Sequence, residues 1–119
     1  MNYEQKTGLL KSNSGTILGH DYSGNGAGKN NAAMQNVHNV GPIPKGGYSI
    51  GEPYDSPHTG PFTLPLTPNP ANIMFGRSEF KIHGDSIAAP GTASNGCIIL
   101  NREVRELINN EDDKYLNVI

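Results

Sequence analysis

Short apolar runs recur along the chain, and glycine, proline or polar residues separate them. Such runs, bounded by turn-forming residues, are typical of β-strands. The runs are Thr16–Leu18, Tyr48–Ile50, Phe62–Leu66, Ile73–Phe75, Phe80–Ile82 and Ile98–Leu100. Residues 8–18 predict two strands around a turn at Asn13–Gly15, and Tyr115–Ile119 predicts a last strand that closes the sheet.

Only one segment, near the C-terminus, has helical spacing. Asn101 is a good N-cap and Glu103 falls in the first turn, so we expect a helix that ends near Asn109–Asn110. The apolar stripe with i, i+3, i+4 spacing consists of Val104, Leu107 and Ile108.

The segment 51–72 carries prolines at 53, 57, 61, 65, 68 and 70, which exclude a helix there. An edge strand at Phe62–Leu66 would tolerate Pro65. The predicted class is therefore mainly β with one C-terminal helix. A length of 119 residues and a mass of 12.7 kDa predict one domain, residues 1–119.

Composition narrows the function classes. The 15 glycines and 9 prolines favour short strands joined by many turns. A net charge of −2 without a lysine or arginine cluster argues against nucleic acid as a partner. No apolar stretch approaches the roughly 20 residues of a membrane span. Met1–Leu10 lacks an apolar signal-peptide core, so we expect cytoplasmic synthesis without Sec export, and a monomer.

The candidate chemistry lies around the only cysteine. His83 precedes Cys97 by 14 positions, and glycines flank both residues. A nearby imidazole makes a thiol nucleophilic, and paired strands would bring the two together. Main-chain N–H groups around Asn95–Cys97 would then face the oxyanion. Asp85, Ser94 or a backbone carbonyl would orient the imidazole, and the pattern does not choose among them. The alternative is an inert, buried cysteine.

Other polar residues carry weaker signals. Arg77 lies upstream of His83, and its guanidinium fork suits a peptide carboxylate, although a surface ion pair with Glu79 is an equal alternative. The glycine-rich residues 22–31 fail the phosphate-loop pattern, so we expect a surface loop near the substrate cleft. We expect neither a metal nor a cofactor, because no ligand spacing links the remaining histidines, His20, His38 and His58.

The His-Gly pair followed by Ser94-Asn95-Gly96-Cys97 resembles the signature of L,D-transpeptidases, the cysteine enzymes of peptidoglycan cross-linking (the YkuD-type catalytic domain). The chain is more similar still to the L,D-transpeptidase-like effectors that Gram-negative bacteria inject into rivals by type VI secretion. The similarity spans roughly residues 8–108. Its ordered motifs are Asn30-Asn31, Gly41–Gly46 with Tyr48 and Ile50, Gly76–Ser78, Phe80–Gly84 and Gly91–Ile98.

The resemblance implies a compact β-sandwich or barrel with Cys97 as nucleophile, His83 as base, and Ser94 and Gly96 in the catalytic loop. The implied substrate is the stem peptide of peptidoglycan. The bond attacked joins the L-configured centre of a diamino acid to D-alanine. The acyl-enzyme passes to water (L,D-carboxypeptidase) or to another D-amino acid (L,D-transpeptidase exchange). Such an antibacterial toxin acts in the periplasm of the target cell, and its partners are a cognate immunity protein and the secretion machinery.

Two departures from the housekeeping enzymes matter. Asn95 stands where they carry a second histidine, and Ile99 stands where they often carry an arginine. No residue of this chain therefore matches the arginine that binds the substrate carboxylate. We expect Arg77 to bind that carboxylate instead, and Asn95 and Asp85 to contact the substrate as well. The alternatives are a phage or prophage lysis protein and a non-catalytic wall-binding module.

Overall fold

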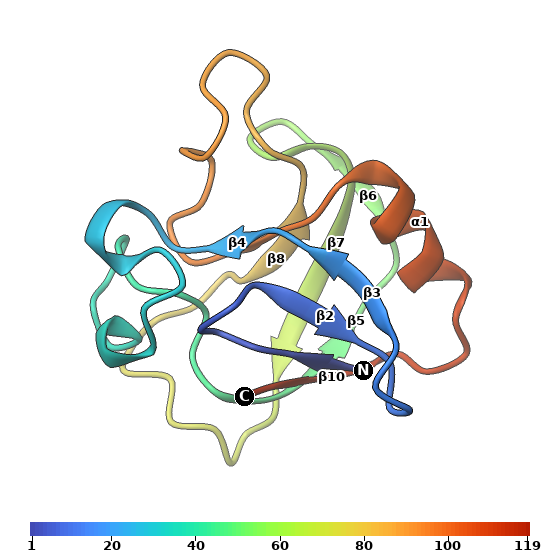
Figure 1. Cartoon of the computed structure of the whole chain (residues 1–119), viewed down its shortest axis with the longest axis horizontal. Coiled ribbons are helices and arrows are strands. Elements are labelled where there is room, and N and C mark those ends of the chain that lie inside the picture. Colours follow the sequence, from blue (N-terminus) through green and yellow to red (C-terminus); the bar gives the residue numbers. More distant parts are fainter.

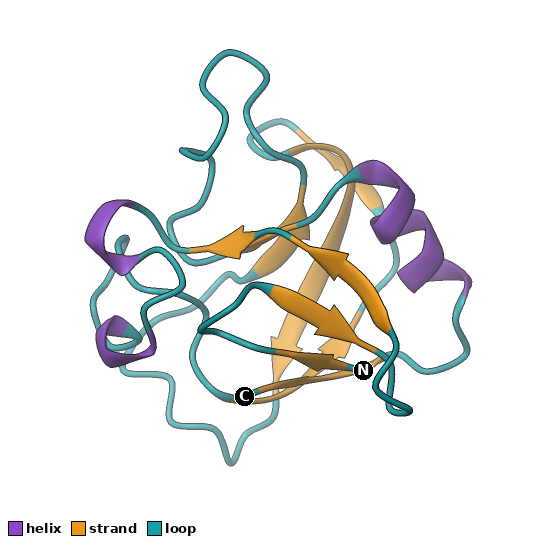
Figure 2. Ribbon diagram, in the orientation of Figure 1, coloured by secondary structure: helices purple, strands orange, loops and turns teal.

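The computed structural model describes all 119 residues, which form ten strands, two 3₁₀ turns and one α-helix (Figures 1 and 2). The mainly β class with one helix is confirmed. The strands are β1 (Asn2–Tyr3), β2 (Leu9–Lys11), β3 (Ile17–His20), β4 (Tyr22–Ser23), β5 (Gly46–Ile50), β6 (Tyr54–Ser56), β7 (Gly60–Pro68), β8 (Lys81–His83), β9 (Ile98–Ile99) and β10 (Tyr115–Val118). The helical elements are η1 (Gly26–Gly28), η2 (Ala32–Met34) and α1 (Arg102–Asn110).

The strands form one continuous path that curls on itself. Its order is β3-β2-β1-β10-β5-β7-β8-β9-β4, with β6 paired to β7 off the path. The two ends of the path, β3 and β4, are joined in sequence by Asp21 alone, so the sheet bends until its ends meet. In β3, a Cβ on Gly19 would lie 2.9 Å from Val104 and 3.2 Å from Leu100. The curled sheet therefore closes around one core.

A cluster of 16 buried apolar residues fills this core. Ile82 of β8 and Ile98 of β9 belong to it, and so do Val104 and Ile108 of α1. Figure 1 shows α1 lying on the outside of the sheet beside β6 and β7. The predicted cap is confirmed, because the Asn101 side chain accepts a 2.9 Å hydrogen bond from the Val104 N–H. The helix, nine residues long, is not one that crosses a membrane.

Two predictions about strands were wrong. Phe62–Leu66 lies inside the sheet, because β7 pairs with β5 on one side and with β8 on the other. Pro65 is tolerated there because it lacks only a donor, and its carbonyl still accepts from the Gly51 N–H at 2.9 Å. Ile73–Phe75 forms no strand, and Ile73 is 73% exposed. The apolar run at 73–75 thus marks a surface loop.

Candidate active site

The parallel pairing of β8 with β9 brings the histidine and the cysteine to one face of the sheet. Ile82 pairs with Ile98, and His83 pairs with Ile99. Because side chains alternate along a strand, Ile82 and Ile98 point into the core while their neighbours point to the other face. Cys97 precedes Ile98, so it shares that other face with His83. The two are diagonal neighbours, with Cys97 level with Lys81.

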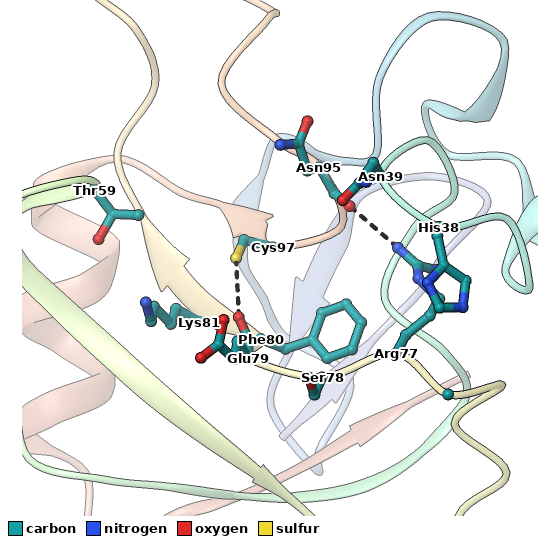
Figure 3. A pocket seen from close by; sticks show the side chains of 11 residues that line it. His38, Asn39, Thr59, Arg77, Ser78, Glu79, Phe80, Lys81, Asn95 and Cys97 are labelled. Carbon is teal, nitrogen blue, oxygen red and sulfur yellow. Dashed lines mark hydrogen bonds between the residues drawn. The ribbon is translucent and has the colours of Figure 1, made fainter.

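The Cys97 thiol lies partly exposed, one residue before β9 begins. Its Sγ donates to the carbonyl oxygen of Glu79 at 3.9 Å, and Figure 3 shows the sulfur directed at that oxygen. Burial raises the pKa of the Cys97 thiol, although the main-chain N–H and the positive charge of Lys81 both favour the thiolate. The resting sulfur is therefore a protonated thiol, and it needs a base to attack.

His83 has the protonation state of a base, and its ring makes no hydrogen bond to Cys97 Sγ, whose partner is the Glu79 carbonyl. Its side chain is buried, and Nδ1 lies 2.9 Å from the carbonyl oxygen of Gly84. A carbonyl only accepts, so Nδ1 carries the proton and Nε2 has a free lone pair. Burial lowers the pKa of His83, which keeps the ring neutral near pH 7. Of the three orienting groups considered, the structure selects the backbone carbonyl.

Ser94 holds the loop that delivers Cys97. Its buried hydroxyl accepts from the N–H groups of Gly24 at 2.9 Å and Gly96 at 3.0 Å, and donates to the Cys97 carbonyl at 2.6 Å. All three hydrogen-bonding positions of the hydroxyl are thus used. The Gly96 amide is used as well, so it is not a donor for the oxyanion. The main-chain N–H of Lys81, which is level with Cys97 in the strand register, favours the thiolate.

Gly96 cannot be replaced without displacing its neighbours. Its φ is +137°, and a Cβ there would lie 2.5 Å from Arg77 Nη2 and 2.8 Å from the Phe80 ring. Both distances are shorter than real Cβ contacts allow. The glycine therefore lets residues 94–97, the nucleophile loop named for the candidate nucleophile Cys97, pack directly on the buried guanidinium.

The structure gives Arg77 a task other than the expected grip on a substrate carboxylate. The side chain is buried, and its two terminal nitrogens donate to four main-chain carbonyls. The fork is therefore filled, and Arg77 is a positioning residue that ties the loop at 35–42 to the nucleophile loop. No ion pair with Glu79 is present either. The four carbonyls belong to Gln35, Gly41, Pro42 and Asn95.

The other two expected substrate residues differ in whether they reach the cleft, because Asn95 lines it and Asp85 does not. Asn95 is exposed at the cleft, and its Oδ1 accepts from the Asn25 side chain at 3.2 Å. Asp85 instead accepts from the Tyr22 hydroxyl at 2.5 Å and from the Gly91 N–H at 3.0 Å. Asp85 thus closes the loop that follows His83 onto β4, and it neither orients the imidazole nor lines the cleft.

A polar cleft of about 390 Å³ opens beside Cys97 (Figure 3). Its walls include Glu79 and Lys81, together with Thr59 and His38 from distant segments. The sequence proposed none of the four as a site residue. Lys81 could have been found, because it lies two residues before His83 on a strand and so shares its face. Thr59 and His38 carry no such signal, since only tertiary folding brings them to the cleft.

We expect Ser94→Ala to destabilise the protein by about 1–3 kcal/mol, because two buried N–H groups and a carbonyl lose their partner. The reactivity of the Cys97 thiol should fall as well, since the loop that carries Cys97 loses these hydrogen bonds. Chemical denaturation measures the first effect, and the alkylation rate of Cys97 under folding conditions measures the second. Ser49→Ala, on an exposed position of β5, is the matched control. Equal midpoints for the two variants would contradict this role of Ser94.

Comparison with known families gives one match. A family model described as the Tlde1 domain matches residues 19–117. The comparisons with curated proteins and with solved structures found no match. The matched range contains β8, β9 and the loops that hold them, so the family is shown over most of the chain and over the whole candidate site.

Proposed function

Because this chain belongs to the Tlde1 domain family of type VI secretion effectors, we propose that it is a cysteine L,D-carboxypeptidase and L,D-transpeptidase of peptidoglycan. The observation that carries the proposal is the pairing of β8 with β9, which puts His83 and Cys97 on one face of the sheet, with Cys97 lining a polar cleft. A neutral imidazole beside a protonated thiol is the resting state of a general-base mechanism.

The proposed reaction begins when His83 Nε2 takes the thiol proton as Sγ attacks the carbonyl carbon between the diamino acid and D-alanine. A C–S bond forms, and the carbonyl oxygen becomes an oxyanion that main-chain N–H groups stabilise. The imidazolium then gives its proton to the departing amine, the C–N bond breaks, and D-alanine leaves. The product is a thioester on Cys97.

The second half of the reaction decides the product. Water that loses a proton to His83 attacks the thioester and releases a tripeptide. The amine of another D-amino acid attacks in the same way and leaves that residue in place of D-alanine. Both outcomes remove stems that donate to cross-links, and so weaken the wall of the target cell. In this account the chain acts in the periplasm of that cell, and a cognate immunity protein of the producer blocks the cleft.

Incubation of purified muropeptides with the protein tests the reaction and the nucleophile together. The wild-type chain should convert tetrapeptide stems to tripeptide, and should exchange D-alanine when another D-amino acid is supplied. Cys97→Ala should do neither, because no thioester can form. Mass spectrometry reads both products. Tetrapeptide left intact by folded wild-type protein, or trimmed equally by Cys97→Ala, would refute the proposal.

The pH dependence follows from the lowered pKa of His83. The neutral ring is the base, so activity should be lost as the pH falls and the ring gains a proton. Since burial lowers this pKa from its ordinary value of 6.5, the acid limb of the kcat/KM profile should lie below pH 6.5. Initial rates on tetrapeptide between about pH 4 and 8 measure the limb. An acid limb above pH 6.5 would contradict the lowered pKa of His83 in the free enzyme.

A further inference from the structure

Lys81 carries a positive charge without a partner in the wall of the cleft beside Cys97. The other cation of that wall is Arg77, whose terminal nitrogens are filled by main-chain carbonyls. The lysines whose ammonium groups make ion pairs or hydrogen bonds are Lys11 and Lys114, so the half-buried Lys81 makes neither. Its ammonium is therefore the cation of the cleft that is free to bind a ligand.

Lys81 neighbours both members of the proposed catalytic pair. It is level with Cys97 across the β8–β9 pair and two residues before His83 on β8, so its side chain shares their face of the sheet. Burial first, and then the charges of Arg105 and Lys81, lower the pKa of His83. The charge of Lys81 also favours the Cys97 thiolate. The ammonium thus acts on the sulfur and on the imidazole.

Glu79 is the one acidic side chain in the same wall. It is exposed, and its carboxylate makes no ion pair with Lys81. The charge of Lys81 is therefore not neutralised within the protein. A carboxylate of a bound ligand would compete only with this solvent-screened side chain for the ammonium.

The dimensions of a peptide suit this position of the ammonium. Neighbouring strands lie about 5 Å apart, and the four-carbon stem of lysine extends its ammonium roughly 6 Å from Cα. In a peptide attacked at its last bond, the carboxylate oxygens lie roughly 4–5 Å from the scissile carbon. A substrate attacked by Cys97 therefore has its terminal carboxylate within hydrogen-bonding reach of Lys81.

The direction of the leaving group agrees with this distance. In the proposed reaction His83 protonates the departing amine, so the leaving amino acid extends from the sulfur towards β8, the strand that carries His83 and Lys81. Figure 3 shows Lys81 on one side of Cys97 and His38 and Asn39 on the other. All of them line the cleft, so the rest of the stem peptide has a place on the far side of the sulfur.

We propose that the Lys81 ammonium binds the carboxylate of the amino acid that leaves, and of the one that enters during exchange. This inference rests on the proposed function and adds a specificity to it: the scissile bond must be the last of the peptide, because an internal bond presents no carboxylate at that position. Lys81 thus takes the carboxylate task that the sequence suggested for Arg77.

Two tetrapeptides that differ only at their C-terminus, a free carboxylate and a carboxamide, test the proposal. Wild-type protein should cleave the acid with a kcat/KM at least about tenfold higher, since a charge-assisted hydrogen bond is lost with the amide. Lys81→Met should reduce the ratio of acid to amide rates towards one, and Lys81→Arg, which keeps the charge, should retain part of it. Lys45→Met is the matched control, because Lys45 is exposed and lies outside this cleft. It should keep the wild-type ratio.

The ratio separates carboxylate binding from the effect of the Lys81 charge on the thiol, because that effect changes the rates on both peptides equally. Lys81→Met also removes no hydrogen bond or ion pair, so the variant should fold. Wild-type activity without preference for the acid, or an unchanged ratio in Lys81→Met, would overturn the inference alone. Inactivity of folded wild-type protein on both peptides would overturn the proposed function, and this inference with it.

The side chain of the diamino acid is a second possible source of a carboxylate. A further pair of tetrapeptides, acid and amide, therefore has lysine as the diamino acid, because the lysine side chain carries no carboxylate. If Lys81 binds the C-terminus, Lys81→Met should lower the ratio of acid to amide rates in both pairs. If Lys81→Met changes only the preference between the two diamino acids, Lys81 binds the side chain and the inference is wrong.

Discussion

The pairing of two very short parallel strands sets the geometry of the whole site. Residues fourteen positions apart in the sequence come to lie two positions apart on one face because Ile82 pairs with Ile98. Strands of three and two residues form too few ladder hydrogen bonds to hold this register alone. The register is also held by pairing with the flanking strands β7 and β4 and by the burial of both isoleucines in the core. Displacing β9 by one residue would turn Cys97 into the core.

Buried polar side chains hold the loop before Cys97, which the strands do not fix. Ser23 donates to the Gly96 carbonyl at 2.8 Å and accepts from the Ile43 amide at 2.9 Å, while Ser94 and Arg77 bind the same loop from its other sides. A chain rich in glycine and proline has much irregular backbone, and each buried N–H or carbonyl in it needs a partner. Three side chains meet that need here, and they fix the loop that carries Cys97 at the same time.

The sequence predicted the parts that local chemistry decides. The Asn101 cap, the turn at Asn13–Gly15 and the strand at Phe80–Ile82 all depend on neighbouring residues, and the structure has each of them within a residue or two. The position of Phe62–Leu66 inside the sheet depends instead on which distant strands pair with it. Ile73–Phe75 forms no strand because no other strand pairs with it. The same limit applies to the site. His83 and Cys97 stand in recognisable motifs, but the four carbonyls that Arg77 binds and the Tyr22 hydroxyl that Asp85 binds come from segments far away in sequence.

The most direct test of the account is the rate at which iodoacetamide alkylates Cys97 near pH 7, with and without the imidazole. If His83 takes the thiol proton, His83→Ala should slow alkylation at least about tenfold. His20→Ala should not change it, because His20 is exposed on β3 and bonds only to the Thr7 carbonyl. Equal rates for wild type and a folded His83→Ala variant would show that the two side chains do not act as a pair, and the central claim would fall.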